Sequence, residues 1–231
     1  LGDVYKRQVQ SIKADSAALT GAEKVLISAD QQWLYVLSGT SNSVLVFSRD
    51  ADSGQVQLAS TFAGDSLSED MQAIVDVVQQ GDSLYLATSA GLFQLRQASD
   101  GSLGQATPLA AIEGLESPQR LLLSSDGQFL LVSGVGGQDL LVSLRIGSDG
   151  SLTEVARSGL GDGTLHNLSA MTQSSDGRFI YALDKQDDGV VQLRILALGS
   201  DGSLQLLGSQ SVDSDAAELA VTADGLSLIH I

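Results

Sequence analysis

The chain has no cysteine, two prolines and one tryptophan among its 231 residues, and aromatic residues make up only 4% of it. Without cysteine, the fold can have neither a disulfide framework nor a thiolate zinc site. No apolar run approaches the roughly 18 residues that a membrane-spanning helix needs. Hydrophobic residues still make up 43% of the chain, so we expect a core built from Leu, Val, Ile and Ala.

Basic residues are also scarce: 12 Lys and Arg stand against 28 Asp and Glu, which gives a formal net charge of −16 at pH 7. A field of that sign repels phosphates, so nucleic acid and anionic membrane surfaces are not expected partners. It is compatible with cation binding, although a solvated acidic surface is the simpler interpretation.

The two ends of the sequence are related through the genetic code. One DNA segment, read in opposite orientations, can encode both LGDVYKRQ at the start and LSLIHI at the end. It resembles the transposase end sequence used to prepare sequencing libraries. We therefore expect residues 1–8 and 226–231 to be translated adapter on a metagenomic fragment, with no consistent place in the fold.

An internal repeat of about 48 residues organises the remaining sequence. The turn after the first strand-like run of each unit recurs at spacings of 50, 46, 50 and 48, at Asp30, Gln80, Asp126, Asp176 and Asp224. Each unit holds four runs of strand length, separated by Gly, Asp and Ser. Four strands per unit at a period in the forties is typical of a β-propeller.

The predicted fold is therefore all-β: an incomplete β-propeller made of four-stranded antiparallel blades. The expected blades are 22–64, 72–110, 118–158 and 167–211, with a partial blade at 216–225. Residues 9–14 are expected to be the outer strand of a preceding blade.

The stretch SDGSL occurs three times, starting at Ser99, Ser148 and Ser200, each time between the third and fourth runs of a unit. An Asp beside hydroxyls could hold a metal or a phosphate. Asp-Gly between two strands favours a tight turn, because Gly adopts positive φ without steric cost. We interpret SDGSL as a turn that recurs because the blade recurs.

The segment 28–56, SADQQWLYVLSGTSNSVLVFSRDADSGQV, shows most fully a composite pattern of S-x-D-G-x-x-L-Y-V, V-x-V-F-x-R-D and D-x-G-x-V. This pattern resembles the lactonase-like seven-bladed propellers, the 6-phosphogluconolactonase-type and YVTN-repeat proteins. The resemblance implies a parent domain of roughly 340 residues. It also implies lactone hydrolase activity and a channel mouth that carries His, Arg and acidic side chains.

Candidate mouth residues follow by counting back from the aligned turns. Seven positions before lie Glu23, Ala73, Gln119, Ser169 and Ala217, and six before lie Lys24, Ile74, Arg120, Ala170 and Glu218. The resemblance makes His166 and Arg120 the catalytic candidates. A general base needs a partner within hydrogen-bonding reach, and Asp162 is near His166 only in sequence, so a loop histidine that faces solvent is the simpler interpretation.

An arginine recurs in the third run of each unit, at Arg49, Arg96, Arg145 and Arg194. These residues could form a ring that binds anions. We favour a structural ladder, in which each arginine pairs with a turn Asp or lies over the neighbouring blade.

Two acidic stretches are candidate calcium sites. Asp50 and Asp52 lie in RDADSG, and Asp184, Asp187 and Asp188 lie in DKQDDG. Neither stretch has the full oxygen ligand set of an EF-hand loop. We therefore expect no cofactor, with Ca²⁺ at these positions as the exception.

Two functions remain open, because propellers host unrelated activities. The favoured hypothesis is a non-catalytic binding or scaffold module of a larger bacterial envelope or secreted protein, with a protein or small-molecule ligand at the channel mouth and no membrane insertion. The alternative is a lactone hydrolase, with a cytoplasmic location also open, whose active site lies largely outside this fragment.

Overall fold

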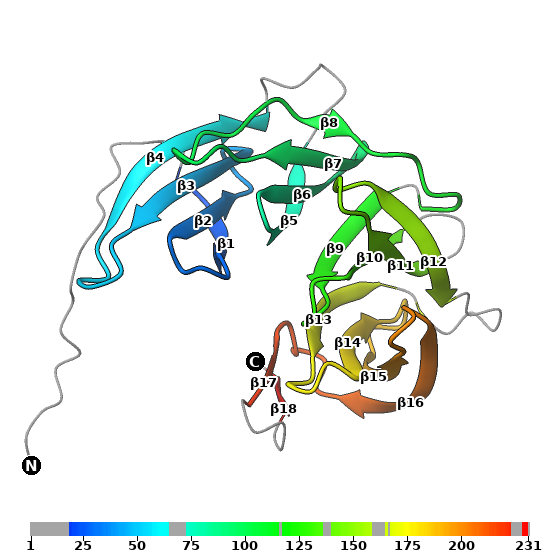
Figure 1. Ribbon diagram of the computed structural model, residues 1–231. Coiled ribbons are helices and arrows are strands. Elements are labelled where there is room, and N and C mark those ends of the chain that lie inside the picture. The colour runs from blue at the N-terminus through cyan, green and yellow to red at the C-terminus, as the bar shows by residue number, and fades with distance from the viewer. Residues whose placement is uncertain are drawn as a thin grey trace, which may run out of the picture.

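The computed structural model describes residues 19–64, 73–115, 117–135, 140–158, 165, 167–222 and 228–230. These residues form four four-stranded antiparallel sheets, each built from strands in sequence order, and one two-stranded sheet. Figure 1 shows the sheets as successive blades around an arc, with β1, β5, β9, β13 and β17 on its inner side. The predicted incomplete propeller is confirmed.

The strands of each blade are consecutive in the chain. Blade 1 comprises β1 (Ala22–Ile27), β2 (Trp33–Ser38), β3 (Ser43–Arg49) and β4 (Val56–Ala63). Blade 2 comprises β5 (Ile74–Gln80), β6 (Ser83–Thr88), β7 (Gly91–Arg96) and β8 (Thr107–Pro108). Blade 3 comprises β9 (Ser117–Leu123), β10 (Phe129–Val135), β11 (Leu140–Ile146) and β12 (Leu152–Ser158). Blade 4 comprises β13 (Leu168–Gln173), β14 (Phe179–Lys185), β15 (Val191–Leu198) and β16 (Leu204–Val212), and β17 (Leu219–Val221) pairs with β18 (Leu228–His230).

The hydrophobic core lies between the blades rather than at one centre. Successive side chains of a strand point to opposite faces, and the inner strands have apolar residues on both. In β6, Leu84 and Leu86 pack against blade 1, whereas Tyr85 and Ala87 pack against blade 3. Blade 2 is therefore stabilised by both of its neighbours.

The hairpin between the first and second strands is closed by a repeated Ser-x-Asp turn. In blade 4, the Ser174 hydroxyl donates to Asp176 at 2.6 Å and accepts from the Phe179 amide at 3.0 Å. Asp176 also accepts from the Arg178 amide at 3.1 Å. Blades 1 and 3 make the same bonds, through Ser28 with Asp30 and Ser124 with Asp126.

The three SDGSL stretches are turns, as predicted. In the third, the Gly199 amide donates to the Ser203 carbonyl, and the Gly202 amide donates to the Gly199 carbonyl, each at 2.9 Å. The Asp201 carboxylate accepts from the Ser203 amide at 3.0 Å. This carboxylate oxygen is thus bonded within the turn.

These turns also join consecutive blades. Gly202 has φ +90°, and a Cβ there would overlap the ring of Phe129 on blade 3. That ring is also covered by the Arg145 guanidinium, 4.7 Å from the ring centroid, and Arg145 donates to the Asp201 carbonyl at 3.1 Å. Aromatic ring, arginine and turn glycine form one contact between blades.

The arginine ladder is confirmed where the arginine lies at the end of a third strand. Arg96 pairs with Asp82 at 2.9 Å and donates to the Asp149 carbonyl of the next blade. Arg194 departs from the predicted ladder, because it lies inside β15 opposite Ala182, not at the strand end. It is buried and pairs with Asp184 at 2.8 Å.

The expectation that residues 226–231 have no consistent place in the fold is wrong for Leu228–His230. This segment forms β18 and pairs antiparallel with β17, in the position of a second strand. The unpaired edge of β17 offers backbone donors and acceptors that any extended segment can satisfy. Residues 1–14 lie outside the described residues.

The contact at Gly202 predicts a measurable difference between two glycines of similar φ. Gly189 has φ +84° and open space around its Cα, so Gly189→Ala should cost only about 1–2 kcal/mol for the left-handed backbone. Gly202→Ala should cost a further ~1–3 kcal/mol, because the methyl group has to displace a buried ring. Urea denaturation of the two variants measures this difference, and equal midpoints would contradict the interblade contact.

Stability should fall in acid because the turn carboxylates are stabilised as anions. The hydrogen bond from the Ser174 hydroxyl, with those from Arg178, lowers the pKa of Asp176 from its ordinary 3.8 to about 2. A carboxyl with a lowered pKa in the folded state stabilises it above the unfolded pKa, and this stability is lost as the pH falls through the folded pKa.

Asp176→Asn should therefore flatten the decline of the urea midpoint between about pH 4 and pH 2. Asp187→Asn is the control, because no hydrogen bond of the Asp187 side chain is found in the described structure. If both variants keep the wild-type pH profile, the Ser-x-Asp turns do not account for acid lability.

Candidate functional site

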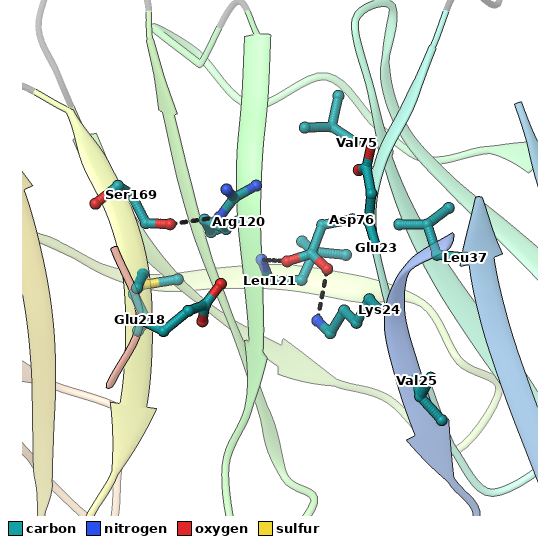
Figure 2. Close-up of a pocket in the computed structure, with 12 residues that line it drawn as sticks. Glu23, Lys24, Val25, Leu37, Val75, Asp76, Arg120, Leu121, Ser169 and Glu218 are labelled. Atoms are coloured by element: carbon teal, nitrogen blue, oxygen red, sulfur yellow. Dashed lines mark hydrogen bonds and ion pairs between the residues drawn. The ribbon is translucent and has the colours of Figure 1, made fainter. Parts of the chain in front are cut away.

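The candidate site is a cavity of about 380 Å³ on the inner side of the arc. The first strand of every blade contributes to it, together with Glu218, which immediately precedes β17. Figure 2 shows these strands side by side, with charged side chains pointing into the space between them. The site thus lies in the central channel, where loops and innermost strands bring distant repeats together.

In each of the four blades, the pairing of the first strand with the second shifts register where the first strand lines the channel. The pairing of β1 with β2 skips Glu23, and corresponding shifts leave Val75, Gln119 and Ser169 as extra residues in β5, β9 and β13. A bulge of this kind re-aims the neighbouring side chains and commonly lies beside functional sites. The residues that follow the bulges are Lys24, Asp76, Arg120 and Ala170.

Asp76 ties three blades together at the channel. Its carboxylate is buried and pairs with Lys24 Nζ of blade 1 at 2.5 Å. The other carboxylate oxygen accepts from the Leu121 amide of blade 3 at 2.8 Å, and the Val77 amide donates to the first oxygen at 2.8 Å. A buried carboxylate with this many partners is fixed in place, and it fixes Lys24 in turn.

Arg120 crosses from blade 3 to blade 4. Its Nε donates to the Ser169 carbonyl at 2.6 Å, and its Nη1 donates to the Gln119 carbonyl at 3.1 Å. No partner of Nη2 is found in the part of the chain that the structure describes. The guanidinium therefore keeps donor capacity in the channel while its position is set by backbone.

Two carboxylates complete the channel lining. Glu23 and Glu218 are exposed, and neither has a hydrogen-bond or ion-pair partner among the described residues. In Figure 2, Glu218 extends from the β17 side toward β9, which carries Arg120. The channel therefore combines one positioned cation, one ion pair and two carboxylates that are open to solvent.

Several residues of this lining were predicted from their positions in the repeat. Lys24, Arg120, Ser169 and Glu218 line the cavity as the counted positions predict. The positions counted in blade 2 are wrong: Ile74 is 1% exposed and packs in the core between blades 1 and 2. The channel residue of blade 2 is Asp76, which the sequence analysis missed.

The cause of this error is a shorter turn. Six residues separate the paired Ile27 and Leu34 in blade 1, whereas four separate the paired Gln79 and Leu84 in blade 2. Counting six positions back from the turn in blade 2 therefore gives Ile74, two residues before the channel residue Asp76. The signal that could have found Asp76 is a lone carboxylate in the apolar run IVDVV.

The calcium candidates are not grouped as ligands in the described part of the chain, and the remaining catalytic candidate is not tested. His166 and Asp162 lie outside the described residues. Asp50 accepts from the Ser53 amide and hydroxyl, each at 2.7 Å, within an exposed turn, and Asp52 is exposed beside it. Among the described residues, no group of three His, Cys, Asp or Glu side chains could hold a metal ion.

The proposed grouping of Asp184 with Asp187 and Asp188 is wrong. Asp184 lies within β14 and is fully buried, where it pairs with Arg194 and accepts from the Asn167 amide at 3.0 Å. Asp187 and Asp188 are exposed in the following turn, and Asp188 accepts from the Val190 amide. The three carboxylates are separated because Asp184 lies within the strand with its side chain buried, whereas Asp187 and Asp188 lie beyond the end of the strand.

Comparisons with known proteins agree with this geometry. No protein-family model matches the sequence, and no curated protein matches it either. Solved structures do match, and they place the fold among the lactonase-like β-propellers.

Three solved structures illustrate the likeness. A protein from Lactobacillus plantarum is 20% identical with a TM-score of 0.69, over 91% of this chain and 63% of its own. The periplasmic gluconolactonase PpgL of Pseudomonas aeruginosa is 21% identical with a TM-score of 0.70, over 90% of this chain and 62% of its own. A putative 6-phosphogluconolactonase from Bacteroides fragilis is 16% identical with a TM-score of 0.52, over 89% of this chain and 75% of its own. The chain thus spans about three fifths of the length of the first two.

The structure contains no helix, in the part of the chain it describes, that is long and apolar enough to cross a membrane.

The role of Asp76 predicts a large loss of stability on truncation. Asp76→Ala should cost roughly 2–4 kcal/mol, because the Lys24 ammonium and two buried amides lose their acceptor. Glu154→Ala is the control: it breaks the more exposed pair with Arg157, which should cost less than about 1 kcal/mol. Urea denaturation compares the two, and a similar small cost for both would show that Asp76 does not hold the blades together.

Proposed function

We propose that the protein, in its full encoded length, binds a sugar lactone in the central channel and hydrolyses it to the aldonic acid. The observation that carries the proposal is the convergence of Arg120, Glu218 and Glu23 on one cavity at the innermost strands. The fold likeness to a gluconolactonase and to a putative 6-phosphogluconolactonase supports the same reaction class.

The chemistry requires water to add to the lactone carbonyl, after which the ring C–O bond breaks. Negative charge develops on the carbonyl oxygen in the transition state, and preorganised donors aimed at that oxygen lower the barrier. Arg120 fits this role, because two backbone carbonyls hold it while its Nη2 remains available. Glu218 fits the role of the base that takes the proton of the attacking water.

The charges of the cavity favour a neutral lactone over a phosphorylated one. Lys24 is already paired with Asp76, so Arg120 is the one cation among the described lining residues that can face a ligand. Glu23 and Glu218 repel a phosphate group. We therefore propose unphosphorylated aldonolactones as the substrate class.

A specific observation also favours the non-catalytic binding module. Lys24, Asp76 and Arg120 all make bonds between blades, so their charges serve the structure as well as the channel. A small ligand bound there without turnover would fit this use of the residues. The periplasmic location in the name of one structural neighbour accords with a place in the bacterial envelope, which we propose for either function.

Turnover separates the two proposals. The protein encoded by the complete gene should hydrolyse glucono-1,5-lactone in a pH-stat assay, with a higher kcat/KM than for 6-phosphogluconolactone. Arg120→Ala should lower kcat/KM by about 100-fold, the effect of removing one oxyanion donor.

Arg145→Ala is the matched control, because Arg145 lies at an outer turn and should leave kcat/KM within about 2-fold. Binding of gluconate without hydrolysis of either lactone would favour the binding module. Equal kcat/KM for wild type and Arg120→Ala would remove the proposed role of the channel.

A further inference from the structure

A second cavity lies at the other end of the inner strands. Its volume is about 490 Å³, and it lies between blades 1 and 2, where the β1–β2 turn, the β5–β6 turn and the residues after β7 meet. The channel site uses the starts of β1 and β5, whereas this cavity uses their ends, and the two share no residue. We call it the junction pocket; its lining includes Ser28, Asp30, Trp33, Gln79, Asp82 and Gln97.

The repeat supplies an internal comparison for this pocket. Gln79 in blade 2 and Gln173 in blade 4 hold equivalent positions, because each pairs with the second residue of the following strand. At the junction of blades 3 and 4, the Gln173 side chain accepts from the Ser125 amide of blade 3 and donates to the Gly177 carbonyl, each at 2.7 Å. That glutamine closes its junction with a bridge.

The corresponding bridge is missing between blades 1 and 2. The β5–β6 turn is two residues shorter, and Gln79 Nε2 donates to the Gly81 carbonyl within its own blade. No hydrogen bond joins Gln79 to Ala29, the counterpart of Ser125, in the described structure. The pocket therefore opens where one blade departs from the repeat.

The polar lining offers both donors and acceptors. Asp30 receives its hydrogen bonds at Oδ1, from the Ser28 hydroxyl at 2.5 Å and the Gln32 amide at 3.0 Å, and Asp82 pairs with Arg96 through Oδ1. In the described structure neither Oδ2 has a hydrogen bond. Both carboxylates therefore have an oxygen that can accept from a ligand hydroxyl.

Gln97 carries a buried donor without a partner beside the pocket wall. Burial raises the pKa of the Tyr35 hydroxyl to about 12, so it stays protonated, and it donates to Gln97 Oε1 at 2.6 Å. The Gln97 Nε2 is buried and has no hydrogen-bond partner among the described residues. A ligand hydroxyl that reaches Gln97 would supply the missing acceptor.

The apolar element of the pocket is Trp33. Its ring is half-buried, packs against Gly101 of the blade 2 turn, and forms part of the pocket wall. An aromatic face beside a few convergent polar groups suits the C–H face and the hydroxyls of a sugar ring. The two carboxylates disfavour anions, and Arg96 beside Asp82 disfavours a cation.

We propose that the junction pocket binds a neutral saccharide, independently of the channel site. Trp33 is the only tryptophan of the 231-residue chain, so its fluorescence reports on this pocket. Titration of the chain with maltotriose, cellotriose or chitotriose should give a saturable change in Trp33 emission for at least one of them, with a Kd of about 1 mM or tighter.

Two equivalent glutamines give a matched test. Gln79→Ala should weaken that Kd by about 5-fold or more, because it removes a polar group from the pocket. Gln173→Ala changes the same position at the closed junction and should leave the Kd within about 2-fold, as should Arg120→Ala in the channel. Circular dichroism of each variant checks that the blades remain folded.

The proposal fails if none of the three saccharides changes the Trp33 emission at tens of millimolar. It also fails if the emission responds to spermidine or to 6-phosphogluconate but to no saccharide, since the site would then recognise charge. Equal Kd values for wild type and Gln79→Ala in folded protein would place the saccharide elsewhere.

Discussion

The packing of one blade against the next is the interaction on which the rest of the structure depends. A four-stranded sheet this small has no interior of its own, so it is stable only when other sheets cover both of its faces. The alternation in β6, where Leu84 and Tyr85 face different blades, shows how one strand serves two interfaces. Burial at these interfaces fixes the strand register, because a slip of one residue would exchange the two faces.

Polar groups at the two ends of the blades join neighbouring blades, whereas the buried Asp184–Arg194 pair lies inside blade 4. At the turn end, Arg145 and Gly202 hold Phe129 between neighbouring blades. At the channel end, Asp76 accepts from blades 1 and 3. The charges of Lys24, Asp76 and Arg120 in the channel are therefore fixed by the same bonds that hold the arc together, and preorganisation of this kind is what a binding or catalytic site requires.

The sequence predicted the features that local chemistry determines. Alternating apolar runs separated by Asp-Gly predicted the strands, the antiparallel blades and the SDGSL turns, because these features depend on residues close together in the chain. Features that depend on how the strands pair with one another could not be predicted from the sequence. Asp184 lies two residues before a turn in sequence, and only the strand register shows that it faces Arg194 in the interior. The strand at Leu228–His230 depends on an open edge rather than on its own composition.

The error at Ile74 and the junction pocket have one physical origin. Both lie at the β5–β6 turn, which is two residues shorter than its counterparts: the shorter turn shifts the count to Asp76, and at this turn Gln79 makes no bond to blade 1 like the bond of Gln173 to blade 3. In a repeat protein, positions that keep the repeat serve packing between equivalent neighbours. A departure that removes a bridge weakens that packing, so it persists only where the weakened packing is compensated or where the opening is used. The junction of blades 1 and 2 is therefore a second place on these blades where a ligand should be sought, and it lies away from the channel where the fold directs attention first.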